Sequence, residues 1–148
     1  MATPSLPRLA VLIDAENASA AQAPALMQII GHYGKPTVRR AYGDWTTPQL
    51  TPWKKLLTSL CIRPCQQFRY VRGKTTTDAA LIMDAMELLH ARSVDGFCIV
   101  SSDCDFTGLA ARIQESGLPV YGFGLQNTLQ AFVAACDEFV YVDALPAV

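Results

Sequence analysis

The sequence has no long apolar run. None reaches the roughly 18 residues that a membrane-spanning helix needs, which predicts a protein without a membrane partner. The first eight residues, "MATPSLPR", lack the apolar core of a secretion signal, so they do not direct the chain to export. Its five cysteines include one close pair, Cys61 and Cys65, and no second pair that would complete a zinc site. Reduced thiols in a cytoplasmic protein are therefore expected.

Charged residues are also scarce, at 17%, whereas 51% of the residues are hydrophobic. This composition favours a sheet covered by helices on both faces. The sequence has no internal repeat and no low-complexity tract, so we expect a single domain over residues 1–148 that begins with a leader at 1–8. The chain stops directly after its last predicted element, which fits a complete small protein or one domain of a longer one.

Short apolar runs alternate with segments of helical periodicity. Strands are predicted at 9–13, 36–43, within 61–71, at 96–100 and 118–124, and at 138–142 as an edge strand. Helices are predicted at 23–34, within 47–60 from Pro52 onward, and at 75–91, 106–117 and 128–136. This alternation predicts right-handed βαβ crossovers and an α/β fold, a three-layer α/β/α sandwich with a mainly parallel central sheet and Rossmann-like winding.

Four aspartates follow or precede these elements at one edge of the predicted sheet. Asp14 ends the first strand, Asp103 follows the fourth, Asp105 lies on the next turn, and Asp78 lies near the start of a helix. Ligands of parallel sheets gather at the carboxyl ends of strands, where the winding direction reverses. If the first and fourth strands are neighbours, these four carboxylates converge on one crevice.

Each of these aspartates taken alone is equally typical of a helix cap or a turn. Two carboxylates about 4 Å apart repel by about 4 kcal/mol at an effective dielectric near 20. A helix terminus returns only roughly 0.3–1 kcal/mol per charge. A divalent cation removes this conflict, and oxygen ligands favour magnesium or manganese. The set therefore predicts a site for Mg²⁺ or Mn²⁺.

Polar residues near these carboxylates are candidates for phosphate binding. Asn17 is placed to donate to a phosphate oxygen, although an ordinary turn residue fits as well. Lys74 precedes Asp78 by four residues and matches developing negative charge, or else is a solvated loop lysine. Ser101 and Ser102 are placed to bind phosphate or to orient Asp103.

Asp84 is a second acidic residue of the same predicted helix as Asp78. It lies about 240° further round that helix, so the two side chains do not share a face. Together with Glu87 it is more typical of a solvated stripe.

The segment from Lys35 to Lys74 contains nine of the twelve lysines and arginines but only one of the thirteen acidic residues. Aromatic residues are interspersed with these bases: Tyr42, Trp45, Trp53, Phe68 and Tyr70. Cations for phosphates and flat rings for bases are typical of a surface that binds single-stranded nucleic acid. The candidates for positioning the strand are Arg39, Arg40, Lys54 and Lys55, and the rings expected to be exposed are Trp45 and Trp53. The alternative is that most of these rings belong to the core.

Four motifs can be compared with a known family. They are "VLIDAEN" (11–17), "GKTTTDAALIMDAM" (73–86), "IVSSDCDFTGL" (99–109) and "GLPVYGFG" (117–124). In order and spacing they resemble the NYN domains of the PIN-like nuclease superfamily, in its LabA-like branch. The resemblance extends over residues 9–142. It implies a PIN-like three-layer fold and a metal-dependent ribonuclease site.

The resemblance also implies which residues form this site. They are Asp14 and Asn17 in the first motif, Lys74, Asp78 and Asp84 in the second, and Ser102, Asp103 and Asp105 in the third. Asp84 thereby becomes a further candidate metal ligand. The main departure is Cys104, at a position where small or polar residues are usual. Relatives often carry a carboxyl-terminal LOTUS-type RNA-binding domain, which we expect in the full-length protein, and we also expect a homodimer.

Three functions are compatible with this pattern. The first is a ribonuclease that uses Mg²⁺ or Mn²⁺ to hydrolyse single-stranded RNA. The second is an RNA-binding module of the same fold that does not cleave. The third is phosphotransfer to small molecules through Asp14 as nucleophile, which is disfavoured because Glu16 stands where such enzymes usually have a second aspartate.

Overall fold

The computed structural model describes residues 5–67 and 77–145, without the side chains of Thr77 and Asp78. Its strands are β1 (Arg8–Asp14), β2 (Lys35–Gly43), β3 (Arg63–Gln66), β4 (Gly96–Val100), β5 (Val120–Gly124) and β6 (Glu138–Tyr141). Its helices are α1 (Ala23–Tyr33), α2 (Thr51–Leu57), α3 (Thr77–Ala91), α4 (Thr107–Glu115) and α5 (Gln130–Ala135), with a short 3₁₀ turn, η3 (Cys104–Phe106), before α4. All the predicted strands and helices are present.

Most boundaries differ from the prediction by a few residues, and two of the differences involve prolines. Helix α2 begins at Thr51 and not at Pro52, and Pro52 lies in its first turn, where its missing N–H group removes no helical hydrogen bond. Strand β3 has only four residues and contains Pro64. It lies at the edge of the sheet, where a proline is tolerated because one side of the strand has no partner.

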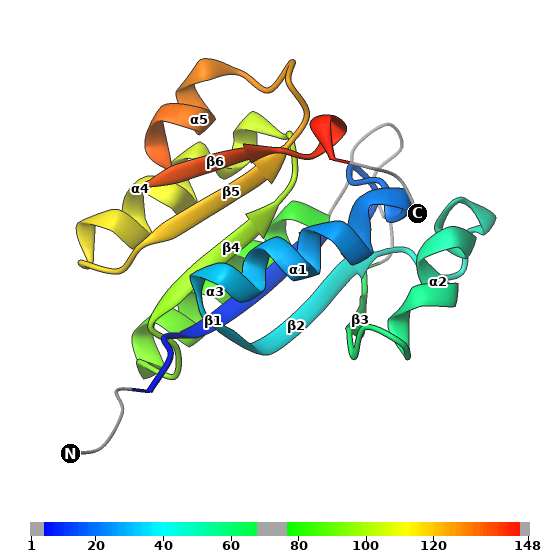
Figure 1. The fold of residues 1–148 in the computed structure, drawn as a ribbon, viewed down its shortest axis with the longest axis horizontal. Helices are drawn as coiled ribbons and strands as arrows, with labels where there is room; N and C mark the ends of the chain where they lie inside the picture. The colour runs from blue at the N-terminus through cyan, green and yellow to red at the C-terminus, as the bar shows by residue number, and fades with distance from the viewer. Residues whose placement is uncertain (1–4, 68–76, 146–148) are drawn as a thin grey trace.

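The six strands form one sheet in the order β3-β2-β1-β4-β5-β6, and every neighbouring pair is parallel (Figure 1). The predicted α/β class with a mainly parallel sheet is therefore confirmed. The chain winds from β1 outward to β3 and then crosses to β4 on the other side of β1. Strands β1 and β4 are thus neighbours at the point where the winding reverses. This is the condition under which Asp14 and Asp103 were predicted to lie at one crevice.

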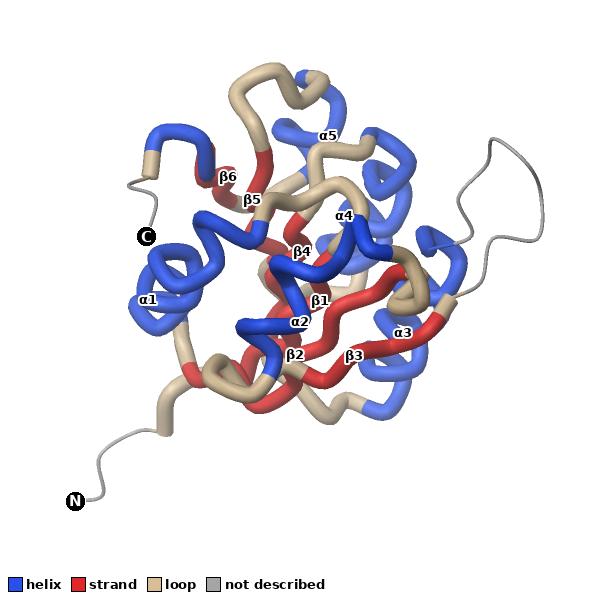
Figure 2. Tube along the Cα trace, turned by 90° about the vertical axis from the view of Figure 1, so that its right-hand side faces the viewer, coloured by secondary structure: helices blue, strands red, loops and turns tan. Residues whose placement is uncertain are grey.

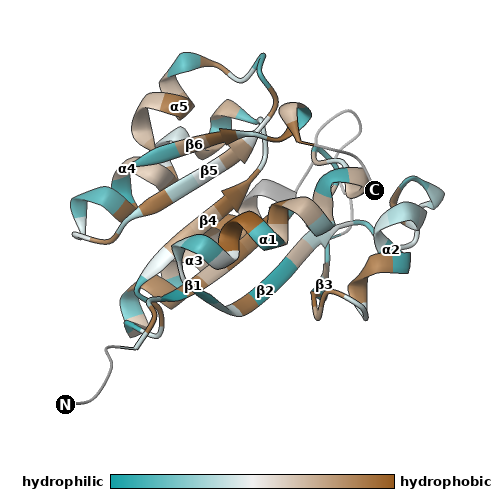
Figure 3. Ribbon diagram, viewed as in Figure 1, coloured by the Kyte–Doolittle hydropathy of each residue, from teal (hydrophilic) through white to brown (hydrophobic). Residues whose placement is uncertain are grey.

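The sheet lies between two groups of helices (Figure 2), hydrophobic residues are frequent along its strands (Figure 3), and the buried side chains form one cluster on each face. Along β1, Leu9, Val11 and Ile13 pack against the face covered by α1 and α2. Ala10 and Leu12 pack against the face covered by α3, α4 and α5. This period of two gives the α/β/α sandwich, and it assigns each residue at a strand end to one face.

The carboxyl ends of all six strands lie at one edge because the strands are parallel. The loop from β1 to α1, the turn from β4 to α4 and the loop after β5 therefore lie near one another at this carboxyl edge. Among residues 5–67 and 77–145, no helix is both long enough and apolar enough to span a membrane.

Candidate active site

Asp14 is the last residue of β1 and is completely buried. The alternation along β1 places its side chain on the α3 side of the sheet, next to Tyr42 in the register with β2. Its Oδ2 atom accepts hydrogen bonds from Nδ2 of Asn17 at 2.8 Å and from Oγ of Ser101 at 2.9 Å. One carboxylate oxygen is therefore held by donors from two separate segments of the chain.

The other carboxylate oxygen of Asp14, Oδ1, is buried and has no hydrogen-bond partner among the described residues. Burial raises the pKa of this carboxyl group above its usual value. Hydrogen bonds from Asn17 and Ser101 lower the pKa, and the charges of Asp103 and Glu16 raise it again. Leaving a buried charged oxygen unpaired is costly. A divalent cation bound to Oδ1 removes that cost, so this residue fits a metal site.

Asp103 and Asp105 lie on the turn η3 that follows β4. The backbone N–H of Asp103 donates to Oγ of Ser101 at 3.0 Å, and Oδ1 of Asp103 accepts from the backbone N–H of Asp105 at 2.9 Å. Asp103 is therefore the N-cap of this turn, and Ser101 contacts both Asp14 and Asp103. The prediction that Ser101 orients Asp103 is confirmed.

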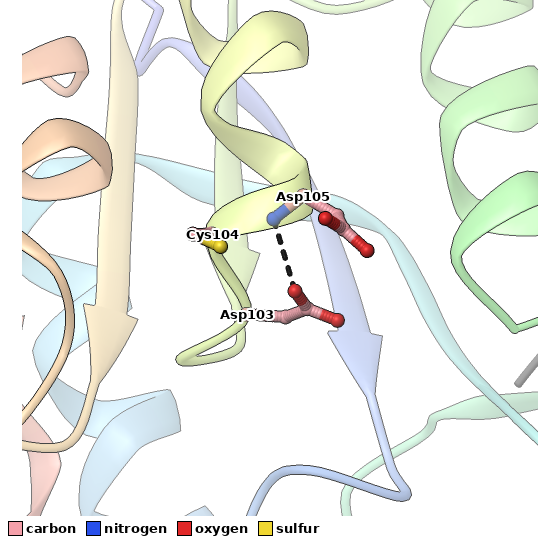
Figure 4. A group of neighbouring side chains, drawn as sticks. All are labelled: Asp103, Cys104 and Asp105. Atoms are coloured by element: carbon pink, nitrogen blue, oxygen red, sulfur yellow. Dashed lines mark hydrogen bonds between the residues drawn. The ribbon is translucent and has the colours of Figure 1, made fainter. Parts of the chain in front are cut away.

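The side chains of Asp103, Cys104 and Asp105 offer ligand atoms within 4.8 Å of one another. In Figure 4 the two carboxylates extend to the same side of the turn and the Cys104 sulfur extends to the other. Both carboxylates are accessible to solvent, Asp103 partly buried and Asp105 exposed. This arrangement suits a cation that prefers oxygen ligands and leaves the thiol out of its coordination.

Two predicted site residues, Lys74 and Asp78, lie outside the described part of the chain or at its boundary. Lys74 lies outside the described residues, and so does the side chain of Asp78. The backbone of Asp78 belongs to the first turn of α3, and α3 contacts both β1 and η3. That Asp78 and Lys74 join Asp14 and Asp103 stays a prediction.

Asp84 lies further along α3, and its described contacts are with β2. Its Oδ2 atom accepts from the hydroxyl of Tyr42 at 2.6 Å and from Nη1 of Arg40 at 3.2 Å. Tyr42 is completely buried, and both burial and Asp84 raise the pKa of its phenol. Sequence reasoning did not identify Tyr42 as a partner of Asp84. The signal was the alternation along β2, which places Tyr42 on the same face as Asp14.

We expect Asp84→Asn to lower the free energy of unfolding by about 1–3 kcal/mol, because the buried Tyr42 hydroxyl and Arg40 lose a charged acceptor. Denaturant unfolding measures this loss. Glu87→Gln, an exposed position on the same helix, is the matched control and should change stability by less than about 0.5 kcal/mol. If both variants are equally stable, the contacts of Asp84 with Tyr42 and Arg40 do not contribute to the free energy of unfolding.

Ser102 connects the ends of two strands. Its Oγ atom accepts from the backbone N–H of Leu125 at 2.7 Å, so the turn after β4 is bonded to the residue after β5. Gly124 precedes Leu125 and lies against both serines of the turn. Binding of phosphate by Ser102 stays a prediction.

The basic segment is only partly as expected. Trp53 was predicted to be exposed, but it is 3% exposed because α2 turns its ring into the core, where the indole N–H donates to the carbonyl of Ala18. Trp45 is partly buried and donates to the carbonyl of Cys65 at 3.1 Å. Tyr42 belongs to the core, and the rings of Phe68 and Tyr70 lie outside the described residues.

The predicted strand-positioning cations are on the surface or near it. Arg39 donates to the carbonyls of Pro36 and Leu60, and with Arg40 and Arg63 it lines an open hollow of about 440 Å³ on β2 and β3. Lys54 and Lys55 are exposed on the last turn of α2. Binding of nucleic acid by these side chains stays a prediction.

An α/β protein with carboxylates gathered at the topological switch point is the class that this fold and site define. The chain matches the NYN domain over residues 8–143 and belongs to this family, whose fold is that of the PIN-like nucleases. The structure resembles the crystal structure of a protein of unknown function from Vibrio parahaemolyticus RIMD 2210633, with a TM-score of 0.77, 20% sequence identity and 97% of each chain covered. That likeness supports the fold. No curated protein matches the sequence.

Proposed function

We propose that the protein is a ribonuclease of the LabA-like branch that hydrolyses single-stranded RNA with Mg²⁺ or Mn²⁺. The observation that carries the proposal is Oδ1 of Asp14, which is buried and has no hydrogen-bond partner among the described residues, while Ser101 links the other oxygen of Asp14 to the backbone of Asp103. The residues that would hold the cation are Asp14, Asp78, Asp103 and Asp105, with Asp84 as a further candidate. When bound, such a cation lowers the pKa of water and neutralises charge on the leaving oxygen.

The side chains around Asp14 prepare its carboxylate for this role. Asn17 and Ser101 donate to Oδ2, so that Oδ1, which has no donor among the described residues, is available to a cation. Asp103 is fixed by its N-cap hydrogen bond to Asp105, so the turn is ordered before a ligand arrives. Groups that are positioned in advance lower the cost of reaching the transition state.

The same proposal assigns the phosphate and the strand to polar and basic side chains. Lys74, Asn17 and Ser102 would contact the phosphate, while Arg39, Arg40, Lys54, Lys55 and Trp45 would position the RNA strand. Hydrolysis then forms a bond between water oxygen and phosphorus and breaks the bond to the ribose oxygen, which leaves with a proton. We also propose a cytoplasmic location, a homodimer and a LOTUS-type domain in the full-length protein.

Cleavage of labelled single-stranded RNA tests this function. We expect products with Mn²⁺ or Mg²⁺ and none with EDTA. Asp103→Asn should slow cleavage about a hundredfold or more, because a bound metal supplies several kcal/mol and each 1.4 kcal/mol changes the rate tenfold. Glu115→Gln, an exposed residue at the end of α4, is the matched control and should cleave as the wild type does.

Two results would contradict the proposal. One is the absence of cleavage with either ion, and the other is equal cleavage by the wild type and Asp103→Asn. Salt-sensitive RNA binding without cleavage would instead identify the protein as a binding module of the same fold.

A further inference from the structure

A pocket of about 350 Å³ opens at the carboxyl edge of the sheet, on the side of α1 and α2. Its walls come from the β1–α1 loop, from α2 and from the ends of β4 and β5. Leu26, Val100 and Phe123 form a buried apolar floor, and the Trp53 ring contributes to one wall. A pocket of this size lies at the lower end of the range for small-molecule sites.

The rim of this pocket is polar but carries no basic side chain. Ser19, Gln22 and Ser102 lie at the rim, and the amide of Gln22 has no hydrogen-bond partner among the described residues. None of the described lining residues is a lysine or an arginine. An apolar floor with donors and acceptors at the rim suits a flat heteroaromatic ring with hydrogen-bonding edges, whereas a phosphate group would find no cation there.

This pocket and the carboxylate cluster share two residues. Asn17 and Ser101 line the pocket, and both donate to Oδ2 of Asp14. The pocket lies on the α1 side of the sheet edge and Asp14 on the α3 side, so the two sites are separated by the end of β1 and β4. Because Asn17 and Ser101 belong to both, the pocket adjoins the carboxylate cluster.

We propose that this pocket binds one nucleobase of the RNA, from the nucleotide that flanks the scissile phosphate. The assignment of the base to an RNA strand rests on the proposed ribonuclease function. The binding of the base itself rests on the shape and the lining of the pocket.

An NMR titration with the four nucleoside 5′-monophosphates tests the pocket, with EDTA present so that no cleavage is involved. We expect the largest amide shifts at Ser19, Gln22 and Leu125. Ribose 5-phosphate, which has the same phosphate but no base, should not produce them. Shifts that are equal with ribose 5-phosphate, or that occur only around Arg39 and Arg63, would overturn the proposal.

Two variants and one control make this test specific. Ala18→Leu places a larger side chain into the pocket and should weaken nucleotide binding about tenfold or more, or roughly 1.4 kcal/mol. Ala21→Leu is the matched control, because Ala21 is exposed on the same segment outside the pocket. If Ala18→Leu does not fold, Gln22→Ala takes its place and should weaken binding about two- to tenfold. Unchanged binding in a folded pocket variant contradicts the proposal.

The result is distinguishable from the outcome of the RNA cleavage experiment. Nucleotide binding in the pocket without RNA cleavage would support the base site and contradict the proposed nuclease function. RNA cleavage without base-dependent amide shifts at the pocket would support the nuclease function and contradict the base site.

Discussion

The Asp14→Asn protein is expected to lose RNA cleavage and yet to unfold at a higher temperature than the wild-type protein at pH 7. The wild-type carboxylate is buried, one of its oxygens has no partner among the residues that the structure describes, and burial raises its pKa. An asparagine keeps an acceptor oxygen for Asn17 and Ser101 but carries no charge. The charge that a cation needs is thus the same charge that destabilises the metal-free protein.

The pH dependence follows from the sign of the pKa shift. Below the ordinary carboxyl pKa of 3.8 Asp14 is protonated in both the folded and the unfolded state, and its charge costs nothing. As the pH rises from there through the raised folded-state pKa, the unfolded chain releases this proton first, so stability falls. Above the folded-state pKa of Asp14 this loss of stability is complete. The advantage of Asp14→Asn should therefore be absent near pH 3 and largest at neutral pH.

Thermal unfolding in EDTA, followed across this pH range, measures the effect. A gain of about 1 kcal/mol corresponds to roughly 2–4 °C for a chain of this length. Addition of Mn²⁺ at about 100 times its Kd should stabilise the wild type by about 2.7 kcal/mol and Asp14→Asn much less. Glu115→Gln serves as the control. It should match the wild type in RNA cleavage, in the pH dependence of thermal unfolding and in the stabilisation by Mn²⁺. A less stable Asp14→Asn protein at pH 7, or equal stabilisation of both proteins by Mn²⁺, would refute the metal role of Asp14.

Gly124→Ala should lower both the stability and the activity of the protein. A Cβ atom at this position would lie 2.8 Å from the carbonyl oxygen of Ser101, 2.9 Å from Oγ of Ser102 and 3.0 Å from the Phe139 ring. Two of these neighbours belong to the turn that holds Asp14 and Asp103, and the carbonyl oxygen is a backbone atom that cannot turn away. Overpacking of this kind costs about 1–3 kcal/mol.

Denaturant unfolding and RNA cleavage measure the two effects of Gly124→Ala. The matched control is Gly31→Ala in α1, where a Cβ atom would meet nothing within 4 Å. The free energy of unfolding of this control should rise by about 0.5–1 kcal/mol, because alanine has a higher helix propensity than glycine. It should cleave RNA as the wild type does. If Gly124→Ala is as stable and as active as the wild type, the turn after β4 has more freedom than its contacts indicate.

The central strands β1, β4 and β5 could be predicted because they are almost entirely buried. All five residues of β4, Gly96–Val100, are buried, and an apolar run of this kind reads as a strand covered on both faces. From the alternation of strands and helices followed the parallel sheet and the place of Asp14 and Asp103 at its carboxyl edge. The contact of Ser101 with Asp103 could also be anticipated, since a serine two residues ahead commonly bonds to the backbone of a turn.

Other features depend on how the elements rotate against one another, which periodicity does not fix. Trp53 lies next to two lysines in the sequence, but α2 directs its ring inward and the lysines outward. Tyr42 meets Asp84 only because α3 packs across β2. Within the described part of the chain, one oxygen of Asp14 has no donor because of the residues that surround it in the fold, which no local motif indicates.

The hydrogen bond between Ser101 and Asp14 joins residues 87 positions apart in the chain. This contact exists only once β4 has been synthesised and has paired with β1. A growing or truncated chain that ends before β4 contains Asp14 but not the serine and the aspartates that complete the described cluster. The described carboxylates therefore come together only in a chain that contains both strands, and their arrangement depends on the completed sheet and not on any local segment.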